Sequence, residues 1–220
     1  MNTIQRNFFR LLRCGVFNTT ETLEPMSVHK WDKLLQLSIL HDVQPYAYKG
    51  LEKCKDQFFV NLNKTQWMQW AQLTENKSSD DEEELLKPYK LTNPILNRQL
   101  QNILDDELSD LNTRKMLIQI IRIARHILNE GLPLKLLIDL GQMIKEKESN
   151  VDYTTLSDWL KKLRFQQMAQ LEGALLIELF GFEAADIPFA QGDVDKKTTI
   201  VAKELAEYTN VHQDFYFSTT

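Results

Sequence analysis

The sequence predicts an all-α protein: a helical bundle of about eight or nine amphipathic helices with no substantial sheet. Three observations lead to this prediction. Apolar residues recur three and four positions apart, the spacing that places them on one face of a helix. The 220 residues include only seven Gly and six Pro, and good helix formers such as Leu, Gln, Glu and Lys are frequent. No segment shows the sustained alternation of apolar and polar residues that is typical of a half-buried strand.

The N-terminal helical part, residues 1–75, is expected to contain four helices. Each combines an apolar stripe with a start or stop signal, such as an Asn or Ser N-cap, an early Pro or a terminal Gly. The expected helices are 3–13, stopped by Gly15; 28–42, capped by Ser27; 45–53, opened by Pro45; and 64–73, capped by Asn63. The expected buried residues include Ile4, Phe8, Leu11, Leu12, Trp31, Leu34, Leu35, Leu40, Tyr46, Tyr48, Leu51, Trp67 and Trp70.

An acidic linker, residues 76–90, is expected to follow. Its stretch NKSSDDEEELLK is polar and has no apolar face until Leu85, which is typical of a solvated segment. Five consecutive carboxylates suggest a calcium site. However, a calcium loop needs alternating ligands and a turn-forming Gly, and this stretch has neither. We therefore interpret it as a linker.

The C-terminal helical part is expected over residues 91–210, followed by a tail, residues 211–220. The two helical parts are expected to pack as one domain. The elements expected in the second part are a helix from Pro94 capped by Asn93; a hairpin over 116–147, capped by Thr113, hinged at Gly131 and reopened by Pro133; a short helix capped by Asp152; a helix over 165–180 closed by Gly181; and a last helix near 199–208.

Charge and cysteine content narrow the classes of function. The net charge of -5 argues against general nucleic-acid binding, which normally needs a basic excess. Cys14 and Cys54 have no metal-ligand spacing and apolar neighbours, so we expect buried free thiols in a reducing compartment. No apolar run approaches the roughly 20 residues that span a bilayer. We therefore expect a cytoplasmic protein that does not bind a membrane and needs no cofactor.

The hairpin segment RHILNEGLPLKLLIDLGQMIK resembles a bacterial family of uncharacterised nucleotidyltransferases. The matching pattern is an Arg-His pair, an acidic residue and Gly at a helix end, and then a Leu-rich helix with an Asp. NPILNRQLQNIL, DYTTLSDWLKKLRFQQMAQLEGALLIELFG and IPF resemble the neighbouring parts of the family. FFRLLRCGVFN and WDKLLQLSILHDVQPYAYKGL resemble its N-terminal helices. These motifs of moderate specificity extend over about three-quarters of the chain.

The catalytic core that this resemblance implies is missing. Family members place a small sheet with a Gly-Asp-x-Asp motif and a further carboxylate between the two helical parts. Those carboxylates hold the Mg²⁺ that bridges nucleotide phosphates and organises in-line attack. The corresponding place in this chain is the acidic stretch of residues 76–87, which is too short for a sheet with crossovers. The departure predicts a protein without nucleotidyltransferase activity.

Gly192-Asp193-Val194-Asp195 matches Gly-Asp-x-Asp letter for letter. Its context does not fit, because the catalytic motif continues along an apolar strand whereas Asp195 is followed by two lysines. We interpret this stretch as a loop and helix cap and do not expect Asp193 and Asp195 to bind a metal.

The candidate site residues form a polar cluster at the hairpin: Arg125, His126, Glu130 and Asp139. An antiparallel helix pair can bring His126 close to Asp139. Such a cluster can contact phosphate or metal, or supply a general base oriented by a carboxylate. It can equally be a polar clasp that fixes the hairpin angle. We favour the clasp because the spacing supplies no nucleophile or third ligand.

The leading hypothesis is a non-catalytic helical protein, related to nucleotidyltransferase-family enzymes, that binds or scaffolds another protein. The alternative is a nucleotidyltransferase-like enzyme or nucleotide-binding protein with an unrecognised site near His126 and Asp139. A third hypothesis, a nucleic-acid-binding regulator built on residues 134–164, is the weakest because the chain is acidic. The sequence leaves the identity of the partner and the oligomeric state open.

Overall fold

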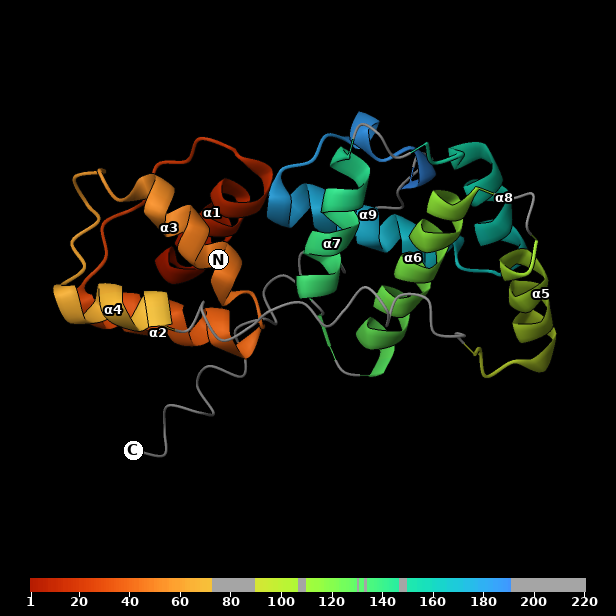
Figure 1. Cartoon of the computed structure of the whole chain (residues 1–220), viewed down its shortest axis with the longest axis horizontal. Helices are drawn as coiled ribbons and strands as arrows, with labels where there is room; N and C mark the ends of the chain where they lie inside the picture. Colours follow the sequence, from red (N-terminus) through yellow and green to blue (C-terminus); the bar gives the residue numbers. More distant parts are fainter. Residues whose placement is uncertain (73–89, 107–109, 130, 133, 147–149, 191–220) are drawn as a thin grey trace. The chain divides into compact units, whose positions relative to one another are not determined.

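The computed structural model describes residues 1–72, 90–106, 110–129, 131–132, 134–146 and 150–190 (Figure 1). These residues contain nine α-helices, two short 3₁₀-helices and no strand, which confirms the predicted all-α class. None of the helices in these ranges is both long enough and apolar enough to cross a membrane. The predicted helix near 199–208, the tail 211–220 and all but the last residue of the predicted linker lie outside the described residues.

The chain divides into two compact units, Met1–Ser79 and Asp80–Thr220. The described part of the first contains α1 to α4, and that of the second contains α5 to α9 with the two 3₁₀-helices. Packing of the two helical parts as one domain stays a prediction.

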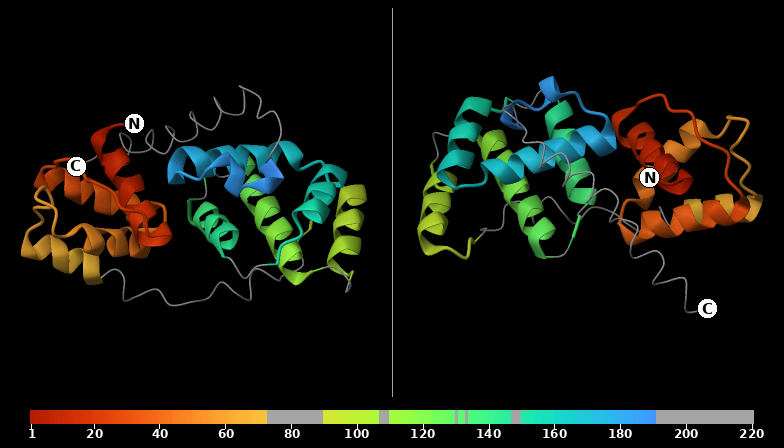
Figure 2. Two further views of the ribbon diagram at one scale, coloured as in Figure 1. Left: turned by 90° about the horizontal axis from the view of Figure 1, so that it is seen from above. Right: turned by 180° about the vertical axis from the view of Figure 1, so that it is seen from behind.

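The first unit consists of α1 (Thr3–Phe17), α2 (Val28–Leu40), α3 (Gln44–Cys54) and α4 (Lys64–Gln72). Helix α1 packs mainly along α3, and both also contact α2 (Figures 1 and 2). The predicted apolar stripes supply most of this core, but Leu40 is exposed and Tyr46, Tyr48 and Trp67 are only half-buried. The fully buried side chains of the unit include Phe8, Phe9, Leu11, Leu12, Trp31, Leu34, Leu51 and Trp70.

Gly15 does not end α1, as the sequence had predicted, but lies inside it at the contact with α3. A Cβ at Gly15 would collide with the carbonyl oxygen of Tyr46 and lie 2.9 Å from the amide nitrogen of Gly50. A Cβ at Gly50 would likewise collide with the backbone of Leu11. The stop falls instead at Asn18, whose left-handed conformation (φ 56°) ends the helix. Both glycines are therefore needed for close packing of the two helices.

Side-chain caps explain several helix starts. Asn63 and Gln66 bond each other's backbone amides at the start of α4, and Asn93 and Asp152 cap their helices as predicted. Thr113 is not the predicted cap, because its helix begins two residues earlier. The carboxylate of Asp110 accepts hydrogen bonds from both the amide and the hydroxyl of Thr113.

The second unit contains α5 (Pro94–Leu104), α6 (Leu111–Asn129), α7 (Leu134–Lys145), α8 (Tyr153–Lys162) and α9 (Gln166–Phe180). Helices α6 and α7 form the predicted hairpin, and the Gln119 amide of α6 donates to the carbonyl of Leu136 in α7 at 2.8 Å. Helix α9 crosses both (Figures 1 and 2) and ends at Gly181 in the left-handed conformation, as predicted.

Two 3₁₀-helices follow α9: η2 (Ala184–Asp186) and η3 (Pro188–Ala190). The sequence had predicted a loop here. Lys145 at the end of α7 forms an ion pair with Asp186 at 2.8 Å, and its ammonium lies 4.8 Å from the centre of the Phe182 ring. Phe189 stacks on Tyr153 of α8. These contacts hold the segment against α7 and α8.

Candidate functional site

The polar cluster predicted at the hairpin is distributed over α6 and α7. Arg125 is exposed and His126 is half-buried near the end of α6, while Asp139 is half-buried in α7. Glu130 lies outside the described residues. The roles proposed for these side chains, a clasp or a phosphate contact, stay predictions.

The backbone around Arg125 and His126 completes the end of α6. The Asn129 amide donates to the Arg125 carbonyl at 2.7 Å, and the Gly131 N–H donates to the His126 carbonyl at 3.0 Å. Gly131 has a φ of 107°, a conformation that L side chains rarely adopt. The predicted hinge is therefore a helix end whose free carbonyls are satisfied locally.

Within the described ranges, no group of three or more His, Cys, Asp or Glu side chains is arranged to hold a metal ion. Asp193 and Asp195 lie outside those ranges, so their interpretation as loop residues stays a prediction.

The most exposed large apolar side chain among the described residues belongs to the first unit. Phe58 is 91% exposed and its neighbour Phe59 is 44% exposed, and both lie between α3 and α4. Their rings pack edge to face with centroids 5.2 Å apart. We call this pair the aromatic tip and residues 55–63 the tip loop.

The aromatic tip occupies the two central positions of a tight turn. The Val60 N–H donates to the Gln57 carbonyl at 2.9 Å, which closes the turn around Phe58 and Phe59. Gly, Pro, Asn, Asp and Ser are the usual residues at such positions, because they favour the required backbone geometry or bond the backbone locally. Two phenylalanines supply neither advantage here. Their presence at an exposed corner points to a role outside the fold of this unit.

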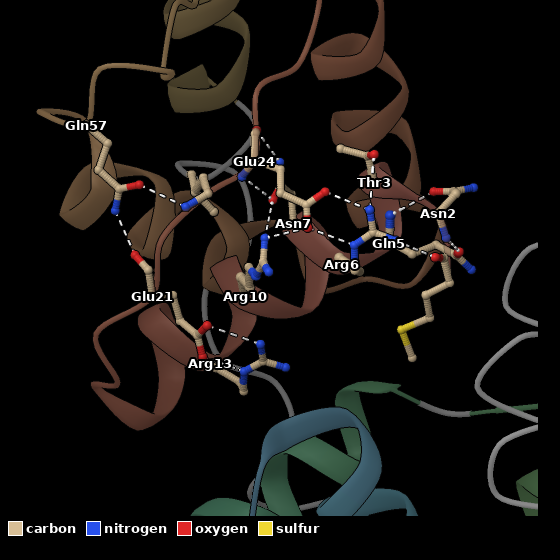
Figure 3. Close-up of polar contacts among 12 residues, drawn as sticks. Asn2, Thr3, Gln5, Arg6, Asn7, Arg10, Arg13, Glu21, Glu24 and Gln57 are labelled. Carbon is tan, nitrogen blue, oxygen red and sulfur yellow. Dashed lines mark hydrogen bonds and ion pairs between the residues drawn. The ribbon is translucent and has the colours of Figure 1, made fainter.

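Gln57 fixes the start of the tip loop. Its side-chain amide donates to the carbonyl of Glu21 at 2.7 Å, and its side-chain oxygen accepts the N–H of Leu23 at 2.9 Å (Figure 3). The Gln57 N–H also bonds the carbonyl of Cys54 at the end of α3. Three hydrogen bonds thus fix Gln57, the residue before the aromatic tip.

The far end of the tip loop is held by α2. The indole N–H of buried Trp31 donates to the side chain of Asn61 at 3.3 Å. Gln66, at the start of α4, donates to the carboxylate of Asp32 at 2.6 Å and to the carbonyl of Val28 at 3.1 Å. Hydrogen bonds at both ends of the loop therefore fix the backbone that carries the two rings.

Gln57 bonds the segment between α1 and α2, and this segment is itself held to α1. The residues that hold it are Arg6, Asn7, Arg10 and Glu24, which we call the Glu24 clamp (Figure 3). The amide of fully buried Asn7 donates to the Glu24 carbonyl at 2.8 Å and accepts the Glu24 N–H at 2.9 Å. Arg6 and Arg10 bond the Glu24 carboxylate at 2.7 and 2.9 Å. These contacts tie the segment between α1 and α2 to α1.

The Glu24 clamp also changes the pKa of the Glu24 carboxyl group. Hydrogen bonding from Arg6, followed by the charges of Arg6 and Arg10, lowers the pKa of the Glu24 carboxyl from 4.5 to about 2. The carboxylate is thus ionised at any neutral or mildly acidic pH. A second pair, Arg13 and Glu21 at 2.6 Å, lies beside it.

The aromatic tip was not among the predicted site residues. One signal was available: Phe58 and Phe59 are adjacent in a stretch between two predicted helices, where no helical stripe accounts for them. What the sequence does not show is that both ends of that stretch are tied down.

Comparison with known proteins adds no relative. No protein-family model, no curated protein and no solved structure matches this chain. The fold therefore defines the class, an all-α protein, and the resemblance to nucleotidyltransferase-family proteins stays a prediction.

Proposed function

We propose that this chain is a non-catalytic helical protein that binds another protein, and that the aromatic tip of its first unit is the anchor of the interface. The observation that supports this proposal is the turn closed by Gln57 and Val60, which holds Phe58 and Phe59 in solvent. Exposed aromatic side chains on a rigid support are typical of binding hot spots.

The charges beside the aromatic tip favour a protein partner. Membrane-surface and single-strand nucleic-acid sites combine aromatic residues with clustered Lys and Arg. Exposed Lys55 is followed by exposed Asp56, so the immediate approach to the tip has no net charge. We infer a partner with an apolar pocket for one or two phenyl rings, surrounded by uncharged or mixed polar groups.

The size of the aromatic tip limits its contribution to an anchor. Burying a fully exposed Phe side chain in an interface stabilises the complex by about 1.5–3 kcal/mol. Because Phe59 is already half-covered, the pair contributes roughly 2–4 kcal/mol to the free energy of binding. A stable interface also needs about 800 Å² on each partner, more than two rings provide. Neighbouring polar surface of the tip loop completes the contact.

Site-specific photo-crosslinking in the cells that naturally express the chain identifies the partner. A photoreactive phenylalanine analogue replaces Phe58 in the full chain, and the matched control places it at Met68, which is 53% exposed in α4 of the same unit. We expect one protein to be linked from position 58 and not from position 68. Loss of that link when Phe59 is also replaced by Ala shows that the pair acts together.

Two outcomes would contradict the proposal. The first is crosslinking from position 58 only to lipid, to nucleic acid or to a second copy of this chain. The second is equal crosslinking of the same protein from both positions, which indicates chance proximity.

The non-catalytic part of the proposal has a separate test. The missing Gly-Asp-x-Asp core predicts that purified protein with nucleoside triphosphates and Mg²⁺ transfers no nucleotidyl group. Stoichiometric nucleotide binding followed by transfer would favour the enzymatic alternative near His126 and Asp139. Replacing His126 with Ala would then abolish the activity.

A further inference from the structure

The two cysteines of the chain meet in the core of the first unit. The sulfur atoms of Cys14 in α1 and Cys54 in α3 lie 3.7 Å apart, although 40 positions separate them in the sequence. Each side chain is 2% exposed, and both thiols are free. The sequence predicted buried free thiols but not that they face each other.

The helix backbones are held together beside this pair. Gly15, next to Cys14, and Gly50, one turn before Cys54, lie where the backbones of α1 and α3 are in close contact. The ammonium of Lys53 also donates to the carbonyl of Cys14 at 2.8 Å and to the side chain of Asn18. Disulfide sulfurs lie about 2.05 Å apart, so the two sulfur atoms must move closer together before they can bond.

The folded state protects the two thiols from reaction. The Cys14 thiol donates to the carbonyl of Thr19 at 3.1 Å, which leaves its sulfur to accept from the Cys54 thiol. Burial, followed by the neighbouring Cys14, raises the pKa of Cys54 to about 12. Because the thiolate is the attacking species, oxidation needs a local opening between α1 and α3.

We propose that Cys14 and Cys54 are an oxidative modification site: opening of the α1–α3 contact lets a small-molecule disulfide convert them to an intramolecular disulfide that links the two helices. This inference does not depend on the proposed partner.

The chemistry has two exchange steps. One cysteine, as its thiolate, attacks a sulfur of an oxidant such as oxidised glutathione and releases one glutathione thiolate. The other cysteine then attacks the protein sulfur of the mixed disulfide, forms the Cys14–Cys54 bond and releases the second glutathione thiolate. Two protein thiols lose two protons and two electrons, and the oxidant's disulfide is reduced to two thiols.

Mass spectrometry of the full chain incubated with oxidised glutathione tests the proposal. We expect a product lighter by two hydrogen atoms, with tryptic peptides 14–30 and 54–55 joined. A disulfide between residues that are far apart in the sequence stabilises a small domain, so the melting temperature of the first unit should rise by on the order of 10 °C. The single variants Cys14→Ser and Cys54→Ser cannot form this product and serve as controls.

The rate of the reaction tests the role of opening. Gly15→Ala, which forces α1 away from α3, should speed disulfide formation at least about tenfold, because overpacking makes the local opening more frequent. Gly131→Ala in the second unit should leave the rate unchanged. If Gly15→Ala does not fold, urea concentrations below the unfolding transition replace it and should accelerate the reaction in the natural sequence.

Three results would overturn the inference. They are thiols that stay reduced in the loosened protein, mixed disulfides with glutathione that do not resolve to the internal bond, and an oxidised product that melts below the reduced protein.

Discussion

Gly15 of α1 lies directly against the carbonyl oxygen of Tyr46 in α3, with no room for a side chain between them. Replacing Gly15 with Ala should destabilise the first unit by about 3 kcal/mol, because the obstacle is backbone and cannot rotate away. Hydrogen exchange followed by mass spectrometry should show faster exchange of amides in α1 and α3.

Gly131→Ala is the matched control for this prediction. No described residue lies within 4 Å of a Cβ at that position, so the expected cost comes from its φ of 107°, about 1–2 kcal/mol. Its effect should be confined to the second unit. Equal exchange in α1 for the natural sequence and Gly15→Ala would show that the helices pack less closely than described.

The Glu24 clamp predicts a specific dependence of stability on pH. The pKa of Glu24 is 4.5 in the reference state and about 2 in the fold, so the stability that it contributes is present above pH 4.5 and is lost as the pH falls toward 2. Glu24→Gln should lower the melting temperature at pH 7, and its difference from the natural sequence should shrink across that range.

Glu52→Gln provides the control, since Glu52 is an exposed carboxylate of α3 outside the Glu24 clamp. Melting curves from circular dichroism at a series of pH values measure both variants. A Glu24→Gln difference that is constant from pH 7 to pH 2 would contradict the role of the ion pairs.

The pH dependence that Glu172 in α9 predicts for stability has the opposite sign to that of Glu24. Its side chain is fully buried, neither carboxyl oxygen has a hydrogen-bond partner among the described residues, and burial raises its pKa well above 4.5. Above pH 4.5 the unfolded chain therefore releases a proton that the folded chain keeps, and the stability of the second unit falls as the pH rises. Glu172→Gln should remove this decline.

Glu172→Leu should go further and stabilise the second unit by roughly 1–3 kcal/mol at pH 7, because it removes an unpaired buried polar group. Glu178→Gln, at an exposed position of the same helix, should have little effect. Hydrogen exchange in α9 measures these changes. Destabilisation by Glu172→Leu would mean that the carboxyl makes a favourable interaction in the fold.

The sequence predicted the all-α class and most helices, because apolar periodicity and caps such as Asn93 and Asp152 are local signals. Gly15 and Thr113 were misinterpreted for a physical reason. Glycine often stops helices, but Gly15 lies inside α1 because it contacts α3. Threonine often caps helices, but the start of α6 is held by the carboxylate of Asp110. At Gly15 a tertiary contact overrides the local preference, whereas at Thr113 a second local signal, Asp110 three residues earlier, holds the start of the helix.

The candidate site was less predictable than the fold. Neither the exposure of Phe58 nor the approach of Cys14 to Cys54 follows from spacing, since both depend on how α1, α2 and α3 assemble. The bonds that Gln57 makes to the segment between α1 and α2 are likewise long-range. Local patterns carry no information about such contacts.

The affinity of the full chain for the protein crosslinked from position 58 tests the central claim most directly. Phe58→Ala combined with Phe59→Ala should weaken binding at least about 30-fold, the loss of a 2 kcal/mol hot spot. The melting temperature should fall only slightly, because Phe58 is 91% exposed and Phe59 is half-covered, and Met68→Ala should bind normally. Unchanged affinity in the double variant would contradict the account, as would an equal loss of affinity in Met68→Ala.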